Sequence, residues 1–119
     1  MGNFRSLEVW KLSKDLAVSI YKLTNIGKFS KDFGLRDQIR RAAVSISSNI
    51  SEGDESGSNK HSIRYFNIAK GSSAEVITQA IIALEIGYIV VEEKENIVSQ
   101  CELISKKLSK LIKYRSNNK

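Results

Sequence analysis

The 119-residue chain contains no proline, one cysteine and one histidine. Proline interrupts the hydrogen bonds of a helix interior, so its absence suits a chain that is mostly helical. A lone cysteine, Cys101, cannot form an internal disulfide, which favours a reducing, cytoplasmic setting. One cysteine and one histidine cannot supply the ligand cluster of a zinc site, and the sequence has no phosphate loop. We therefore expect neither a metal nor a cofactor.

The sequence also lacks an apolar run long enough to cross a membrane. Its most apolar segment, residues 76–91, is shorter than the roughly 20 residues that a spanning helix needs. This segment also contains Gln79 and Glu85. The first residues lack the apolar core of a signal peptide. We expect a cytoplasmic protein that does not associate with membranes.

Apolar residues recur at helical spacing in four segments, and this pattern predicts four amphipathic helices. The expected helices cover residues 7–26, 35–52, 59–91 and 94–115, followed by a frayed C-terminal tail. Gly71 lies inside the third segment, where glycine costs roughly 1 kcal/mol relative to alanine. Its presence predicts a close helix–helix approach at this position. Four such helices with short connectors predict an all-α fold, in which residues 1–119 form a single antiparallel up-and-down four-helix bundle.

Polar residues follow a regular pattern in the stretch QIRRAAVSISSNISEG, residues 38–53. Residues three or four apart share one ridge of a helix, as do Gln38, Arg41, Ser45, Asn49 and Glu52. The third segment has a matching set, Ser72, Glu75 and Gln79. Short hydrogen-bonding groups and an arginine are typical of a seam between packed helices. We expect a structural polar seam, within one chain or between subunits, in which Arg41 and Glu75 form an ion pair.

The net charge of +6 is moderately basic, and the lysines gather near the C-terminus. A basic terminus attracts phosphate, but lysines in the last turns also complement the helix dipole and keep the chain soluble. Both interpretations remain open for this segment. The candidate nucleic-acid-binding residues are Arg36, Arg40, Lys106, Lys107, Lys110 and Lys113.

Catalytic residues are not indicated. The histidine, His61, is expected on the surface near the start of the third helix. Some four-helix-bundle ribonucleases place an arginine four to six residues before a catalytic histidine, and this chain has none there. Cys101 falls on an apolar helical stripe, as a buried structural thiol does. We expect that the protein is not an enzyme.

Three segments, LEVWKLSKDLAVSIY, GLRDQIRRAAVSISSNISEG and FNIAKGSSAEV, resemble the 23S rRNA-intervening-sequence protein family, also called S23-type. The resemblance covers nearly the whole chain and implies a small bacterial four-helix bundle that assembles as a ring-shaped homopentamer. The positions that match the family motif are Trp10, Gln38, Arg40, Arg41, Ser45, Asn49, Glu52, Gly53, Gly71, Ser72 and Glu75. The chain departs from the family in lacking prolines near Ser30 and at Ser47, and in having Arg36 where threonine or serine is common.

A related branch of the family comprises the accessory proteins of diversity-generating retroelements. This branch implies basic pentamers that bind nucleic acid and a partner protein, a reverse transcriptase. Apolar or aromatic residues outside the main stripes, Val44, Tyr65 and Tyr88, independently indicate a homo-oligomer. Our first hypothesis is a non-catalytic oligomer that binds RNA or DNA phosphates through lysine and arginine. The alternative is a structural module that binds a partner protein without binding nucleic acid.

Overall fold

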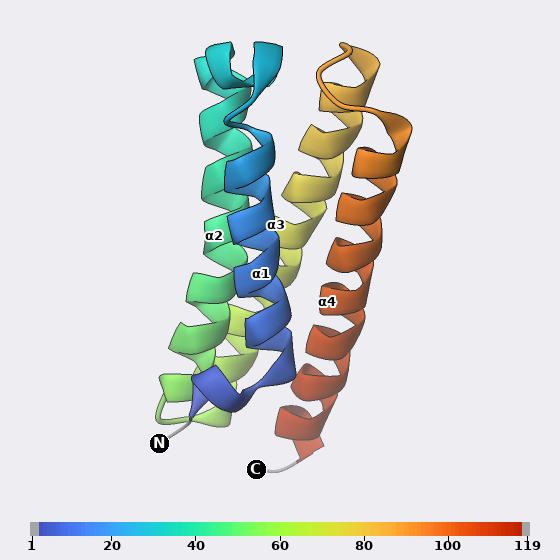
Figure 1. Cartoon of the computed structure of the whole chain (residues 1–119). Coiled ribbons are helices and arrows are strands. Elements are labelled where there is room, and N and C mark those ends of the chain that lie inside the picture. The colour runs from blue at the N-terminus through green and yellow to red at the C-terminus, as the bar shows by residue number, and fades with distance from the viewer. Residues whose placement is uncertain (1–2, 118–119) are drawn as a thin grey trace.

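The computed structural model describes residues 3–117, and this part of the chain folds into four α-helices without a β-strand. The elements are η1 (Phe4–Ser6), α1 (Glu8–Leu23), η2 (Gly27–Lys31), α2 (Phe33–Glu55), α3 (Asn59–Glu85) and α4 (Val91–Asn117). Successive helices run in opposite directions, and both chain ends lie at the same end of the bundle (Figure 1). The predicted all-α four-helix bundle is therefore confirmed.

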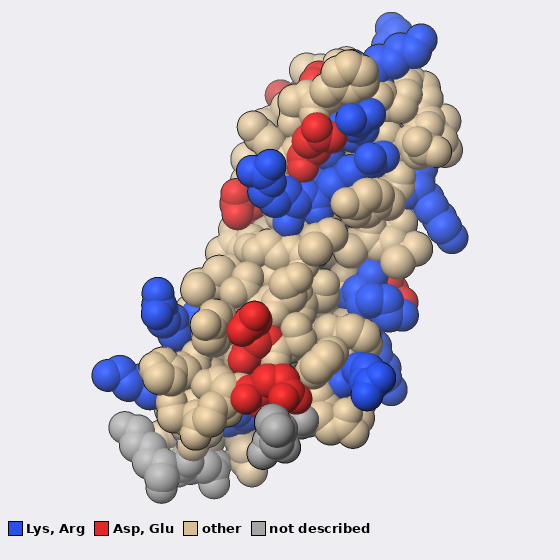
Figure 2. All heavy atoms as spheres, turned by 90° about the vertical axis from the view of Figure 1, so that its left-hand side faces the viewer, with Lys and Arg blue, Asp and Glu red and all other residues tan. Residues whose placement is uncertain are grey.

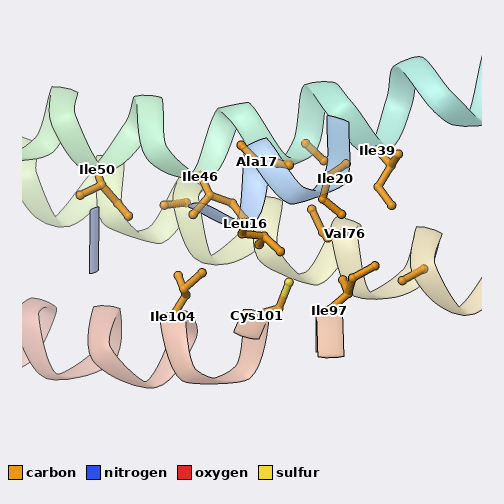
Figure 3. Close-up of a cluster of buried hydrophobic side chains, with 14 of the residues drawn as sticks. Leu16, Ala17, Ile20, Ile39, Ile46, Ile50, Val76, Ile97, Cys101 and Ile104 are labelled. Atoms are coloured by element: carbon orange, nitrogen blue, oxygen red, sulfur yellow. The ribbon is translucent and has the colours of Figure 1, made fainter. Parts of the chain in front are cut away.

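The core is the set of apolar stripes that the helical spacing predicts. Leu16 and Ile20 of α1, Ile46 of α2, and Cys101 and Ile104 of α4 all point into the space between the helices (Figure 3). All five side chains are fully buried. Complete burial of a leucine or isoleucine stabilises the fold by about 1.5–3 kcal/mol relative to leaving it exposed. This packing, repeated along the bundle, fixes which side of each helix remains on the surface.

The start of α2 differs from the sequence prediction because Asp32 caps the helix two residues earlier than expected. α2 begins at Phe33 because the Asp32 carboxylate accepts a hydrogen bond from the Leu35 amide at 3.1 Å. The second carboxylate oxygen accepts a hydrogen bond from the Tyr88 hydroxyl at 2.8 Å. The Leu35 amide first, and then Tyr88, hold the pKa of Asp32 below its ordinary value. The same hydrogen bond raises the pKa of Tyr88.

The expected extent of the third helix to residue 91 is wrong, because α3 ends at Glu85. Gly87 then adopts a φ of 84°, a left-handed conformation that favours glycine, and α4 begins at Val91. The helical part of α4 extends through Asn117, so the first residues of the expected frayed tail are helical. The rest of that tail, residues 118–119, lies outside the described residues.

The close helix–helix approach expected at Gly71 occurs at Gly53 instead. Gly71 is exposed, and apart from its chain neighbours and the backbone of its own helix, no atom of the described residues lies within 4 Å of the place its Cβ would take. At Gly53, a Cβ would lie 2.6 Å from a ring carbon of Phe66 and 3.2 Å from the backbone oxygen of Ser62. The small residue that lets α2 approach α3 is therefore Gly53.

None of the helices in residues 3–117 combines the length and the apolar character that crossing a membrane requires.

Candidate functional site

The predicted polar seam lies along the side of the bundle where α2 meets α3. At its centre, the hydroxyl groups of Ser45 and Ser72 form a hydrogen bond of 2.9 Å between the two helices. Asn49 donates from Nδ2 to the Ser45 carbonyl at 2.8 Å and to the Ser45 hydroxyl at 3.0 Å. Glu52 lies farther along α2 and is exposed, in a hollow that His61 also lines. Among the predicted seam residues, Ser45 and Ser72 thus form the hydrogen bond between α2 and α3, and Asn49 supports Ser45 from within α2.

The remaining seam residues surround an open hollow of about 420 Å³, which we call the α2–α3 hollow. Its lining residues are Gln38, Arg41, Ala42 and Ser45 from α2, with Glu75 and Gln79 from α3. Arg41 and Glu75 lie at the same level, as expected, but both are exposed and no ion pair joins them in residues 3–117. The predicted ion pair is therefore wrong for the single chain. Two solvated charges at an open rim gain little by pairing.

Gln79 is the buried polar residue of the α2–α3 hollow. Its residue is only 9% exposed, and its Oε1 atom is buried without a hydrogen-bond partner among the described residues. A buried carbonyl oxygen without a donor is unfavourable, because it has lost its water without gaining a replacement. The hollow thus has an unsatisfied acceptor at its base and charges of both signs at its rim.

The arginines predicted to bind nucleic acid, Arg36 and Arg40, are held by contacts within the chain. Arg40 donates from Nε to the Thr24 hydroxyl at 2.7 Å, and its guanidinium lies 4.6 Å from the centre of the Tyr21 ring. Arg36 donates to the Ser30 carbonyl at 3.0 Å. Arg36 also pairs with the carboxylate of its neighbour Asp37 at 2.9 Å. These contacts join α2 to α1 and to the connector between them.

The face centred on α2 has an uneven distribution of charge. Figure 2 shows basic side chains gathered toward the upper end with several acidic groups among and beside them, and in the lower half acidic side chains at the centre with basic ones toward both edges. The order along α2 agrees, since Arg36, Arg40 and Arg41 precede Glu52 and Glu55. This face is therefore not uniformly basic, as a continuous phosphate-binding surface would be.

The lysines of α4 differ in what they contact. Lys107 is bound to Glu8 of α1 at 2.7 Å, and this hydrogen bond holds the pKa of Glu8 below its ordinary value. Lys106, Lys110 and Lys113 are exposed, and none of them forms an ion pair with a carboxylate of residues 3–117. Their spacing of four and three residues places them on one outer stripe of α4. We call these three residues the α4 lysine stripe.

Sequence reasoning missed a buried ion pair near the chain ends. Arg115 of α4 donates to the Asp54 carboxylate of α2 at 2.8 Å and to the Ser62 hydroxyl of α3 at 3.0 Å. The Ser62 hydroxyl in turn donates to the Gly53 carbonyl at 2.6 Å. The available signal was the position of Arg115, seven residues after the core residue Leu108 on the same helical stripe.

Side chains of the types that most often bind metals or act in catalysis do not cluster in the part of the chain that the structure describes. Residues 3–117 contain no group of three or more histidine, cysteine, aspartate or glutamate side chains placed to hold a metal ion. Burial raises the pKa of Cys101 to about 11, although a hydrogen bond with Ser73 opposes this shift. The thiol is therefore protonated at neutral pH and contributes to packing.

Comparison with known proteins places this geometry in a family. A crystal structure of a protein of unknown function from the S23 ribosomal protein family of Bacteroides thetaiotaomicron is 30% identical to this chain. The match covers 88% of this chain and 98% of the other, with a TM-score of 0.80. Among curated proteins, no match was found. The family model for the 23S rRNA-intervening sequence protein matches residues 5–110, so the chain belongs to that family.

Proposed function

We propose that this protein is a non-catalytic, self-associating four-helix bundle that binds the phosphates of RNA or DNA through the α4 lysine stripe. The observation that carries the proposal is that Lys106, Lys110 and Lys113 are exposed on one side of a helix without acidic partners in residues 3–117. No carboxylate forms an ion pair with these lysines, although Glu102 lines the same groove as Lys106 and Glu8 the same hollow as Lys110, so their ammonium groups are open to a phosphate. The other candidates, Arg36, Arg40 and Lys107, already hold contacts within the chain.

Self-association strengthens this proposal through the summed charge. The net charge of one chain is +6, and several copies in one assembly add their fields. Lysines on successive turns are about 6 Å apart, so a single stripe contacts only a few phosphates. Repeated stripes in one assembly would engage one nucleic acid at several points, which raises the overall affinity.

The test is to replace Lys106, Lys110 and Lys113 together with glutamine. Binding to a structured RNA and to a DNA duplex is measured by fluorescence anisotropy across a salt series. We expect weaker binding and a salt dependence that is shallower by about one unit of slope for each lost phosphate contact. Helicity measured by circular dichroism should be unchanged, because the replaced side chains are exposed.

The matched control replaces Lys28, Lys31 and Lys60, which are also exposed but lie outside α4's outer stripe. This variant loses the same charge and should bind nearly as well as wild type. Equal weakening by both triple variants would show that only net charge matters and would contradict a stripe-specific site. Wild-type protein that binds neither nucleic acid at low salt would contradict the proposal altogether.

A second candidate function is binding of a partner protein. The observation that favours it is a set of exposed apolar residues at the end of the bundle that carries the α1–α2 and α3–α4 connectors. These residues are Ile26, Phe33, Ile86, Val90 and Val91, each more than half exposed. Exposed apolar groups that gather in one place mark interaction surfaces more often than isolated ones do. Absence of nucleic-acid binding would leave this candidate as the better supported one.

A further inference from the structure

Tyr114 is an exposed aromatic residue on the basic C-terminal part of α4. The residue is 62% exposed, so most of its ring lies outside the core. It follows Lys110 by about one turn of the helix and comes directly after Lys113. An aromatic ring therefore borders the α4 lysine stripe.

Tyr114 also lines an open hollow between α4 and the start of α1, which we call the α1–α4 hollow. The two segments lie side by side near the chain ends (Figure 1). The hollow has a volume of about 320 Å³. Its other lining residues are Leu7, Glu8, Val9, Lys107, Lys110 and Leu111. Its aliphatic members are buried or half-buried, whereas Glu8 and Lys110 are exposed, so the hollow has apolar walls and a charged rim.

The charges at the α1–α4 hollow leave an excess of positive charge. Glu8 is the single carboxylate among the lining residues of the described chain, and Lys107 binds it at 2.7 Å. Lys110 forms no ion pair with a carboxylate of residues 3–117. A ligand with a flat apolar part and an attached negative charge would fit both the walls and the rim.

A nucleotide with an unpaired base has this combination of properties. Bases of every kind stack on aromatic side chains, because each base has a π-face. The attached phosphate is an anion that lysine binds. Residues four apart on a helix have Cβ atoms roughly 5–6 Å apart, so Tyr114 and Lys110 can contact the base and the phosphate of one nucleotide. In a duplex the bases present only their edges to the grooves, so a surface tyrosine cannot stack on their faces.

We propose that Tyr114 and the α1–α4 hollow hold an unpaired base of a single-stranded RNA or DNA whose phosphates lie along the α4 lysine stripe. The base stacks on the Tyr114 ring, and Lys110 contacts its phosphate. The inference rests on the phosphate binding proposed above and specifies the ligand as an unpaired strand. Lysines alone would not distinguish single strands with bases from strands without them, whereas the tyrosine does.

The experiment compares two oligonucleotides of equal length and charge, an oligothymidine strand and a strand in which every nucleotide lacks its base. Fluorescence anisotropy gives the Kd of the full-length protein for each strand at one low salt concentration. Wild type should bind the intact strand at least about fivefold more tightly, the lower end of what one stacked base contributes. Tyr114→Ala should bind both strands as wild type binds the abasic one. Tyr114→Phe retains the ring and should keep the preference.

Two further variants separate stacking from a loss of apolar surface. Tyr114→Leu keeps an apolar side chain without an aromatic face and should bind like Tyr114→Ala. Leu103→Ala is the matched control, because Leu103 is 43% exposed and lies about three turns before Tyr114 on the same side of α4, outside the hollow. This variant should keep the wild-type preference. Circular dichroism checks that every variant is folded.

The outcomes separate base binding from phosphate binding. Equal affinity of wild type for the two strands, or a Tyr114→Leu variant that keeps the preference, would overturn stacking on Tyr114 while the α4 lysine stripe stands. The triple glutamine variant of the stripe should lose affinity for both strands. Wild type that binds neither strand at low salt would overturn both proposals.

Two other occupants of the hollow would be identified if the preference for the intact strand were absent. Vesicles of an anionic phospholipid that capture wild type but not Tyr114→Ala would assign the hollow to a membrane surface. A lower mass of Tyr114→Ala than of wild type in light scattering would assign it to a second copy of the chain. Either result would overturn the base-binding proposal.

Discussion

At the scale of single residues, Asp54 and Arg115 form the contact in which a substitution should matter most for stability. Their side chains are only 5% and 19% exposed. Removing one member of a buried pair leaves the other charge without a partner, which typically costs about 3–5 kcal/mol. We expect Asp54→Ala and Arg115→Ala each to lower the free energy of unfolding by an amount in this range. The double variant should cost less than the sum of the two.

The measurement is a double-mutant cycle from urea unfolding at one fixed protein concentration. Lys14 and Asp15 provide the control cycle, because this ion pair is 48% and 64% exposed. Exposed pairs contribute about 0–1 kcal/mol. If the Asp54 and Arg115 losses were additive, the two side chains would not be coupled and the pair would not hold α4 against α2.

Asp32 gives a prediction about pH. Because the Leu35 amide and Tyr88 lower its pKa in the folded state, its charge stabilises the fold above the ordinary aspartate pKa. This contribution is lost as the pH falls through the lowered pKa. Asp32→Asn keeps an oxygen that can cap α2 but removes the charge. We expect its melting temperature to be below that of wild type at neutral pH and to converge with it in acid, as the pH falls through the lowered pKa of Asp32.

The control for this titration is Asp37→Asn, which removes an exposed carboxylate near the same helix start. Its melting curve should follow that of wild type more closely at every pH. A difference between Asp32→Asn and wild type that persists unchanged in acid would mean that the lost charge is not the cause.

Single residues also show why parts of the candidate site could not be predicted. The sequence correctly placed Arg41 and Glu75 at the same level of α2 and α3. The helical repeat and the antiparallel pairing of the two helices are enough to align these positions. Whether two long side chains meet depends on their conformations and on solvent, which a sequence pattern does not contain. Likewise, Arg40 reaches Thr24, sixteen residues away, across a connector whose geometry has no repeating pattern.

At the scale of helices, the two helical glycines give opposite predictions. Gly71→Ala should stabilise the protein by about 0.5–1 kcal/mol, because glycine is a poor helix former and nothing crowds this exposed position. Gly53→Ala should destabilise it by about 1–3 kcal/mol, because the new methyl group would overlap the Phe66 ring and press on the Ser62 backbone. Thermal unfolding of the two variants at one concentration checks the difference in sign.

Equal changes at the two glycines would contradict the close approach of α2 to α3 at Gly53. Gly71 was the more obvious candidate in the sequence because it interrupts a long apolar segment, whereas Gly53 lies at the start of a polar turn-like stretch. The helices themselves could be predicted because amphipathic spacing is local. The start of α2 was missed although Asp32 is a local N-cap signal, whereas the hydrogen bond from Tyr88, 56 residues later, has no signal in the local pattern.

At the scale of the whole molecule, composition predicted a net positive charge. It did not show which basic side chains remain free to contact nucleic acid after folding. Of the six residues predicted to contact nucleic acid, the structure finds Arg36, Arg40 and Lys107 engaged within the chain. The three that remain lie together on α4. A sum of charges cannot make this distinction, because pairing depends on which helices become neighbours after folding.

The even number of helices has a practical consequence for fusing this protein to a tag or anchoring it to a surface. Because the helices alternate in direction, residues 3 and 117 emerge at the same end of the bundle (Figure 1). A reporter or an affinity handle joined to either terminus would therefore leave from that end. The opposite end, with Ile26, Phe33 and Val90 exposed, would stay clear. Molecules anchored to a sensor chip by one terminus would all present the same apolar end to a partner in solution.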